Sequence, residues 1–237
     1  MHKTRGYKRE TPTELVRDYK LFAIVCEGSK REPSYFNVFR HLSSKIAVDV
    51  IEEIVSDEEI RAVQSKKSAP KWLLDRALIY IEKEGLNDED DLWFVMDIDK
   101  WQVEQLRDIA LHCEENPNWH IVLSNPCFEV WLYFHKKADL SKSTSKSSQE
   151  FKTEIATLEK GGYHPYTFIP QLPEAIKNAK AMDTNPEHFM PDFKETKVYQ
   201  LGEAIMHVIG KNDFDKFITN TLPKLIQMDK DKDKKVR

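Results

Sequence analysis

Two apolar runs of strand length stand out along the chain, and both stop at acidic residues. Residues 21–26 (LFAIVC) are apolar at every position and end at Glu27-Gly28-Ser29, a turn-forming sequence. Residues 92–96 (LWFVM) are equally apolar and end at Asp97-Ile98-Asp99. Strands that are apolar on both faces are typical of the centre of a parallel sheet, which helices cover on either side. The pattern therefore predicts two buried strands with acids at their carboxyl ends.

Other patterns fill the intervals between and after these runs. Residues 46–55 alternate apolar and polar side chains over part of their length, which predicts a strand with one solvated face, and 120–123 (HIVL) predict a further short strand. Helical spacing of apolar residues recurs after Pro33, after Pro70 and over about 102–114. Strands that alternate with helices predict an α/β fold with a mostly parallel sheet flanked by helices.

The run FEVWLYF at residues 128–134 is compatible with a strand or a helix. Pro126 before it and Lys136-Lys137 after it favour a short buried helix. A polar loop over residues 140–148 then leads into a helical C-terminal third. The organisation expected is a basic N-terminal arm at 1–20, an α/β core at 21–140, a helical part of the same domain at 149–226 and a charged tail at 227–237.

Composition narrows the class of protein. A chain of 237 residues with 40% apolar and 32% charged residues fits one soluble globular domain, with a helical addition. No run approaches about 18 apolar residues, and no signal-peptide core opens the chain, so we expect a cytoplasmic protein without a membrane partner. Cys26, Cys113 and Cys127 are far apart and odd in number, which argues against a disulfide framework or a thiolate zinc site.

Charge gives only a partial indication of a partner. The net charge of −4 does not by itself indicate nucleic-acid binding, because a duplex favours a strongly basic surface. Basic residues nevertheless gather at both ends of the chain, within 3–9 and within 230–237. Such runs are usually solvated ends, and contacts with phosphates are the alternative.

The acids at the strand ends predict a metal site. In an open parallel sheet, side chains just beyond the carboxyl ends of the strands share one crevice, so Glu27 and Asp97 meet if their strands are neighbours. Asp99 points to the same side as Asp97 if the backbone stays extended. Such acids repel one another unless a hard divalent cation offsets their charge, and Mg²⁺ or Mn²⁺ is the expected ion. The alternative for a lone Asp-x-Asp is a local turn.

The order strand-Glu-Gly and later strand-Asp-x-Asp resembles the TOPRIM fold, which topoisomerases, primases and several nucleases share. More closely, the stretches FAIVCEGSKREPSYF, LWFVMDIDKW and IVLSNPCFEVWLYFH resemble the RloB-like (AbiLii-type) proteins of bacterial defence loci. The resemblance runs from about residue 5 to at least residue 135. It implies a TOPRIM-like sheet with a helical C-terminal extension, nuclease activity in anti-phage defence by abortive infection, and an ABC- or SMC-type ATPase partner encoded in the same locus.

The resemblance also implies site residues. The acid of the first strand falls on Glu27, the paired aspartates on Asp97 and Asp99, and the second acid of the first motif on Glu32. Glu32 remains open between a metal ligand and a first-turn acid that the helix dipole favours. Glu129, within SNPCFEVW, is an added catalytic candidate, and a helix-surface acid is its alternative.

Two features depart from the family pattern. Arg31 stands where a small hydroxyl residue is expected, and it can pair with Glu32 or, together with Lys30, contact a phosphate. The C-terminal third matches the family only loosely, so no catalytic lysine is assigned there. Lys177 and Lys180 are candidates, but surface lysines on a helix are the favoured reading.

The function expected is metal-dependent phosphodiester cleavage, in which one or two ions held by Glu27, Asp97 and Asp99 activate water. The substrate is DNA or RNA, and homo-oligomers are compatible with the sequence. No Walker-type loop is present, so ATP hydrolysis would come from the partner. The alternative is a non-catalytic subunit of a defence complex that senses metal or nucleotide.

Overall fold

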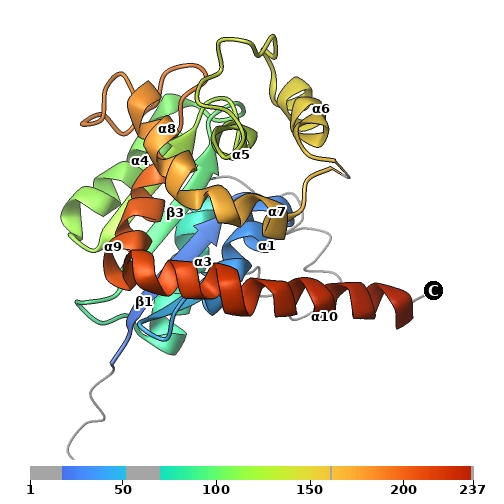
Figure 1. Ribbon diagram of the computed structural model, residues 1–237. Helices are drawn as coiled ribbons and strands as arrows, with labels where there is room; N and C mark the ends of the chain where they lie inside the picture. Colours follow the sequence, from blue (N-terminus) through green and yellow to red (C-terminus); the bar gives the residue numbers. More distant parts are fainter. Residues whose placement is uncertain (1–17, 52–69, 161, 236–237) are drawn as a thin grey trace, which may run out of the picture.

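The computed structural model describes residues 18–51, 70–160 and 162–235 (Figure 1). The strands are β1 (Lys20–Cys26), β2 (Ile46–Ile51), β3 (Asp91–Asp97) and β4 (Trp119–Ser124). The helices of the first half are α1 (Arg31–Asn37), the 3₁₀ turn η1 (Val38–His41), α3 (Pro70–Glu84), α4 (Val103–Glu115) and α5 (Glu129–Phe134). The later ones are α6 (Ser148–Leu158), α7 (Pro165–Phe168), η2 (Ile169–Gln171), α8 (Leu172–Met182), α9 (Val198–Lys216), the π-helical turn η3 (Phe217–Thr221) and α10 (Leu222–Lys235).

The strands form one parallel sheet in the order β2-β1-β3-β4. The two runs that are apolar on both faces are its central strands, and they are hydrogen-bonded neighbours. Strand β2 lies at an edge, and its partly exposed Ala47 and Asp49 fit the alternation seen in the sequence. The predicted α/β fold, a parallel sheet flanked by helices with a helical C-terminal part, is confirmed.

Helices cover both faces of the sheet. Buried residues of α3 and α4, such as Leu73 and Leu106, pack on one face against β1 and β3. The opposite face carries α1, α5 and the helices of the C-terminal third, whose buried side chains form a larger core with Phe22 and Val95. A sheet covered on both faces explains why the central strands read as continuous apolar runs.

The C-terminal helices close over this larger core. Helices α8 and α9 pack so tightly that a Cβ atom at Gly202 would lie 2.9 Å from Cγ1 of Ile176. The segment before α9 runs along the open edge of β4, where Thr196 bridges Ser124 and the Lys197 N–H donates to the Leu123 carbonyl at 2.8 Å. The C-terminal third therefore covers one sheet edge as well as one face.

Several boundaries differ from the sequence patterns. Helix α1 begins at Arg31, two residues before Pro33, and passes into η1 at Val38. The FEVWLYF run is the short buried helix that the flanking residues favoured, although its first residue, Phe128, precedes the helix. The charged stretch after residue 226 continues α10 as far as Lys235. Residues 52–55 of the second predicted strand, most of the N-terminal arm and the last two residues lie outside the described ranges. Within those ranges, no helix has the length and apolar character needed to cross a membrane.

His135 is buried against side chains of the larger core. Its Nδ1 is 3.1 Å from the Trp131 carbonyl oxygen, and its Nε2 is 2.9 Å from the Tyr35 hydroxyl. A neutral ring that donates from Nδ1 and accepts the Tyr35 proton at Nε2 satisfies both contacts. Burial lowers the pKa of His135 to about 3, against an ordinary value of 6.5.

This buried histidine makes stability depend on pH. The folded state holds the ring neutral while the unfolded chain protonates it near pH 6.5, so its contribution is complete above that pH and is lost as the pH falls toward 3. Between pH 7.5 and pH 5 the loss should be about 2 kcal/mol. Urea unfolding at both pH values should show that His135→Gln, which cannot titrate, loses about 2 kcal/mol less than wild type over this interval. Equal losses in the two proteins would contradict this account.

Candidate metal centre

Two of the predicted acids meet where β1 and β3 end. Glu27 follows the last residue of β1, and its N–H donates to the Val95 carbonyl of β3 at 3.0 Å, which continues the ladder by one bond. Its Oε2 then accepts the N–H of Asp97, the last residue of β3, at 3.0 Å. Because the strands are parallel neighbours, both acids leave the sheet at the same edge.

Two further acids come from helices that start beside this edge. Glu32, in the first turn of α1, is buried, and its carboxylate folds back over Gly28. Glu129 is the first residue of α5 and is only 2% exposed, so the helix-surface alternative for it is wrong. It lies five residues beyond the end of β4, after the turn that contains Asn125-Pro126.

The Glu32 carboxylate lies so close to Gly28 that it leaves no room for a side chain at this position. A Cβ atom at this position would lie 2.1 Å from Oε2 of Glu32, well inside van der Waals contact. The carboxylate is the mobile end of its side chain, so it can swing away at a modest cost in folding energy, but it then leaves the acid cluster.

Gly28→Ala should therefore lower the affinity for Mn²⁺ by about 10-fold, with a change in unfolding free energy within about 1 kcal/mol. Calorimetric titration and urea unfolding measure the two effects. Gly85→Ala is the matched control, because Gly85 has a φ of 77° and open space around it. It should cost about 1–2 kcal/mol of backbone strain and leave Mn²⁺ affinity unchanged. Equal Mn²⁺ affinities for the two variants would contradict a place for Glu32 in the centre.

The acids strain one another electrostatically. Burial raises the pKa of Asp97 well above its ordinary value, and Glu32, Glu27 and Glu129 raise it further. Burial likewise raises the pKa of Glu32 and of Glu27. For Glu27, the Trp101 indole, the Asp97 N–H and Lys100 lower the pKa and so offset part of this rise. Lys100 Nζ lies 3.9 Å from Glu27 Oε1. An excess of buried negative charge is thus the main electrostatic property of this edge.

Protein donors occupy most of the carboxylates. The Asp97 N–H binds Glu27, the Ser148 hydroxyl at the start of α6 donates to Asp99, and the Arg31 guanidinium pairs with Glu129. The structure thus pairs Arg31 with Glu129, not with Glu32. Within the described ranges, no three His, Cys, Asp or Glu side chains are arranged as a ready set of metal ligands.

The residues nevertheless suit a divalent cation by their chemistry. They supply carboxylate oxygens, the ligands that Mg²⁺ and Mn²⁺ prefer, and Oε2 of Glu129 is buried without a hydrogen-bond partner. A buried carboxylate oxygen in that condition is unfavourable unless a cation or donor completes it. Glu27, Glu32, Asp97 and Glu129 would hold an ion at this edge, and Asp99, which is exposed, would join after releasing Ser148.

The remaining predicted lysines are exposed, and two of the cysteines are buried. Lys30 is exposed immediately before α1, and Lys177 and Lys180 are exposed on α8, where Lys180 pairs with Glu203. The thiols of Cys26 and Cys127 are buried, and burial raises the pKa of both.

A buried ion pair that no pattern in the sequence indicates lies in the C-terminal third. Lys197 Nζ lies 2.7 Å from both carboxylate oxygens of Asp183 and 2.6 Å from the Asn185 carbonyl oxygen. The Tyr199 hydroxyl donates to the same carboxylate at 2.7 Å, and Lys197 and Asp183 are both 1% exposed. No periodicity or motif signals this pair, because its partners come from either side of a loop.

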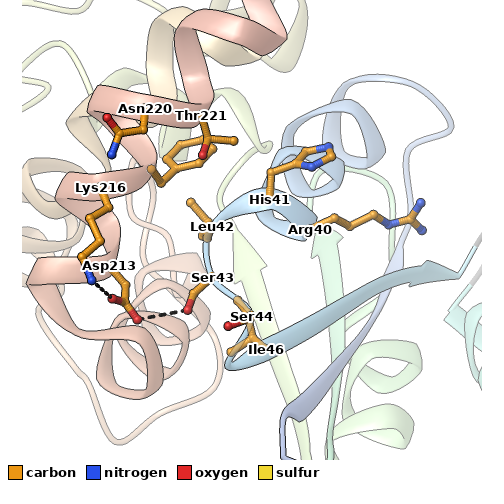
Figure 2. Close-up of a pocket in the computed structure, with 11 residues that line it drawn as sticks. Arg40, His41, Leu42, Ser43, Ser44, Ile46, Asp213, Lys216, Asn220 and Thr221 are labelled. Carbon is orange, nitrogen blue, oxygen red and sulfur yellow. Dashed lines mark hydrogen bonds and ion pairs between the residues drawn. The ribbon is translucent and has the colours of Figure 1, made fainter.

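The polar hollow drawn in Figure 2 belongs to another part of the molecule. It has a volume of about 540 Å³ and lies between residues 40–46 and 213–221. Asp213 is held there by Ser43 and Lys216, at 3.1 and 3.2 Å, while Arg40 turns toward Asp49. Since β2 begins at Ile46, this hollow lies at the amino end of that strand, and the acids lie at carboxyl ends. It is not part of the candidate centre.

A comparison with known protein families identifies the family of this chain. The model of the RloB-like protein family matches residues 22–205, a span that includes the acids at both strand ends, Glu129 and the Lys197 pair. No curated protein and no solved structure matches the chain. On the strength of a match over most of its length, the chain belongs to the RloB-like protein family.

Proposed function

We propose that this protein is a Mg²⁺- or Mn²⁺-dependent nuclease that cleaves DNA or RNA in anti-phage defence. The observation that carries the proposal is the convergence of Glu27, Glu32, Asp97 and Glu129, largely withdrawn from water, at one edge of a parallel sheet. Buried acids that raise one another's pKa destabilise the fold, and a bound cation offsets this cost. Acids with perturbed pKa values cluster at functional sites. Membership of the RloB-like family is consistent with a defence role.

The residues of the centre would have different roles in this reaction. A bound divalent cation would supply an activated water and charge stabilisation at the phosphate. Asp97 and Glu129, both nearly inaccessible, suit the inner ligand positions, and exposed Asp99 suits the side that faces the substrate. The raised pKa of Glu27 brings its carboxyl closer to neutral titration, which suits either a ligand or a general acid–base. Lys100, beside Glu27 and more than half exposed, would attract a phosphate.

The proposal also includes binding of a partner ATPase. Self-association of the chain is a further part of the proposal. Helices α3 and α4 expose several large apolar side chains on the face away from the larger core, namely Trp72, Leu78, Ile79, Val103 and Leu111. Exposed apolar side chains on such a face could be covered by a protein partner. Co-purification with the ATPase of the same locus should be reduced in Leu78→Glu and Ile79→Glu if that face is the contact.

Cleavage assays test the proposal. The purified protein, alone and with the ATPase, is incubated with plasmid, single-stranded DNA and tRNA in Mg²⁺, Mn²⁺ or chelator. We expect metal-dependent cleavage in at least one combination and a loss of about 100-fold or more in Asp97→Asn. Asp108→Asn, at an exposed acid on α4, is the matched control and should retain activity. Wild type that is as inert as Asp97→Asn in every combination would remove the nuclease proposal.

A second candidate function is a non-catalytic sensor of metal or nucleotide. Two observations favour it: protein donors already occupy three of the acids, and the chain has a net charge of −4. A sensor should bind Mn²⁺ and change its affinity for the ATPase in response, with no cleavage of any substrate. Measuring that affinity with and without Mn²⁺ separates the two functions.

A further inference from the structure

The guanidinium of Arg31 forms an ion pair with Glu129, one of the acids of the candidate centre. Glu129 is nearly inaccessible to solvent, yet its oxygens differ: Oε1 is paired with Arg31, and Oε2 is buried without a partner. One oxygen of this carboxylate is therefore paired with a cation, and the other has no hydrogen-bond donor or cation. Arg31 therefore neutralises the charge of Glu129 while leaving Oε2 without a partner.

Arg31 itself keeps most of its binding capacity. A guanidinium has five N–H donors, and one nitrogen, Nη1, makes the contact with Glu129. About a third of the side chain, 32%, is exposed, and the guanidinium lies over the Tyr163 ring at 5.4 Å from its centroid. The hydroxyl of Tyr163 is buried and also lacks a hydrogen-bond partner. Both groups therefore retain unused hydrogen-bonding capacity beside the stacking contact.

The charges around this pair favour an exchange. Among the described residues, five acids of the centre have two cations in ion pairs with them, Arg31 on Glu129 and Lys100 on Glu27. A divalent cation that binds Asp97 and Glu129 would repel the guanidinium and satisfy the open Oε2. A displaced guanidinium stacked on an aromatic ring is well suited to bind a phosphate through two parallel hydrogen bonds.

We propose that Arg31 is an internal counter-ion that competes with the metal for Glu129 and, once displaced, binds a phosphate of the nucleic acid against Tyr163. The inference rests on the proposed function, because it requires a metal at the acids. It makes the order of events explicit: metal binding frees the residue that recognises substrate. Arg31 thereby couples the two ligands, and a coupling of this kind commonly changes affinity by about 5-fold or more.

Calorimetric titration with Mn²⁺ tests the competition. Arg31→Met should bind Mn²⁺ at least about 5-fold more tightly than wild type, because the competing cation is gone. In a Glu129→Gln background the same change should have no effect, since the contested carboxylate is absent. Lys83→Met is the control, because Lys83 is an exposed cation in the last turn of α3, to which no role in metal or phosphate binding is assigned. It should leave Mn²⁺ affinity within about 2-fold of wild type.

Substrate binding tests the second step. Fluorescence anisotropy with a labelled oligonucleotide, in Ca²⁺ in place of the active ion, should show at least about 5-fold weaker binding by Arg31→Met and by Tyr163→Leu. In chelator, both variants should match wild type. Far-ultraviolet circular dichroism and thermal unfolding confirm that each variant is folded, and Arg31→Lys supplies a milder change if Arg31→Met is not.

The outcomes distinguish the inference from the function on which it rests. A wild-type protein that binds Mn²⁺, together with an Arg31→Met variant that binds it equally or more weakly, would make the Arg31–Glu129 pair a static salt bridge and overturn the exchange alone. Absence of Mn²⁺ binding by both proteins would overturn the metal centre and the exchange together.

Discussion

Asp97→Asn should be more stable than wild type when metal is absent and should lose the stabilisation that metal gives. Asp97 is buried among other acids, so its charge opposes folding, and an uncharged isostere removes an unfavourable term of about 1–3 kcal/mol. For a chain of this size, each kcal/mol corresponds to about 2–4 °C in Tm. Mn²⁺ at about 100 times its Kd should stabilise wild type by about 2.7 kcal/mol and leave the variant unchanged.

Thermal unfolding of both proteins in chelator and in Mn²⁺ measures this effect, and Asp108→Asn again serves as the control. The pH dependence has a definite sign. Because the folded-state pKa of Asp97 is raised, its destabilising effect is absent below the unfolded pKa and grows as the pH rises through the folded pKa. The advantage of Asp97→Asn should therefore be larger at pH 7.5 than at pH 4.5. A variant that is less stable than wild type in chelator would contradict the electrostatic account.

Lys197→Met should lower the unfolding free energy by about 3–5 kcal/mol, the largest stability loss that we expect from a single change. The substitution leaves the buried carboxylate of Asp183 with the Tyr199 hydroxyl but without its cation. Natural domains of this kind are stable by about 5–15 kcal/mol, so the loss is a large fraction of the total. Urea unfolding gives the free energy, and the Tm should fall by at least about 6 °C.

Lys180→Met is the matched control, because Lys180 forms an exposed ion pair with Glu203 at the same 2.7 Å separation. Its cost should stay within about 1 kcal/mol. In the double variant Lys197→Met/Asp183→Asn, removal of the orphaned charge should return part of the lost stability, so that the two changes are not additive. If Lys197→Met and Lys180→Met cost the same, burial of the pair would not matter.

The sheet and its acid edge could be predicted from the sequence because their signals are local. A central parallel strand must be apolar on both faces, so the continuous apolar runs at residues 21–26 and 92–96 predict the two central strands. Parallel neighbours end at the same edge, which brings Glu27 to Asp97 whatever the loops between them do. The buried helix at 129–134 followed from its flanking residues in the same way.

The partners of the charged side chains could not be predicted, because they depend on tertiary packing. Arg31 has Glu32 beside it in sequence, yet it pairs with Glu129, which is 98 residues away. The carboxylate of Glu32 folds over Gly28 instead. Lys197 is buried through Asp183, which lies across a loop of the C-terminal third. Such contacts leave no periodic pattern, because a charged residue that is buried by its partners looks like any surface charge in the sequence.

Diffraction from crystals soaked in Mn²⁺, with data collected for the anomalous signal of manganese, tests the metal centre most directly. We expect an anomalous peak about 2.0–2.6 Å from carboxylate oxygens of Asp97 and Glu129, beside Glu27, with the Arg31 guanidinium moved away from Glu129. Crystals of Asp97→Asn should lack the peak. A fully ordered site with Arg31 still on Glu129 and no manganese among the acids, at Mn²⁺ concentrations that saturate other metal-dependent nucleases, would contradict it.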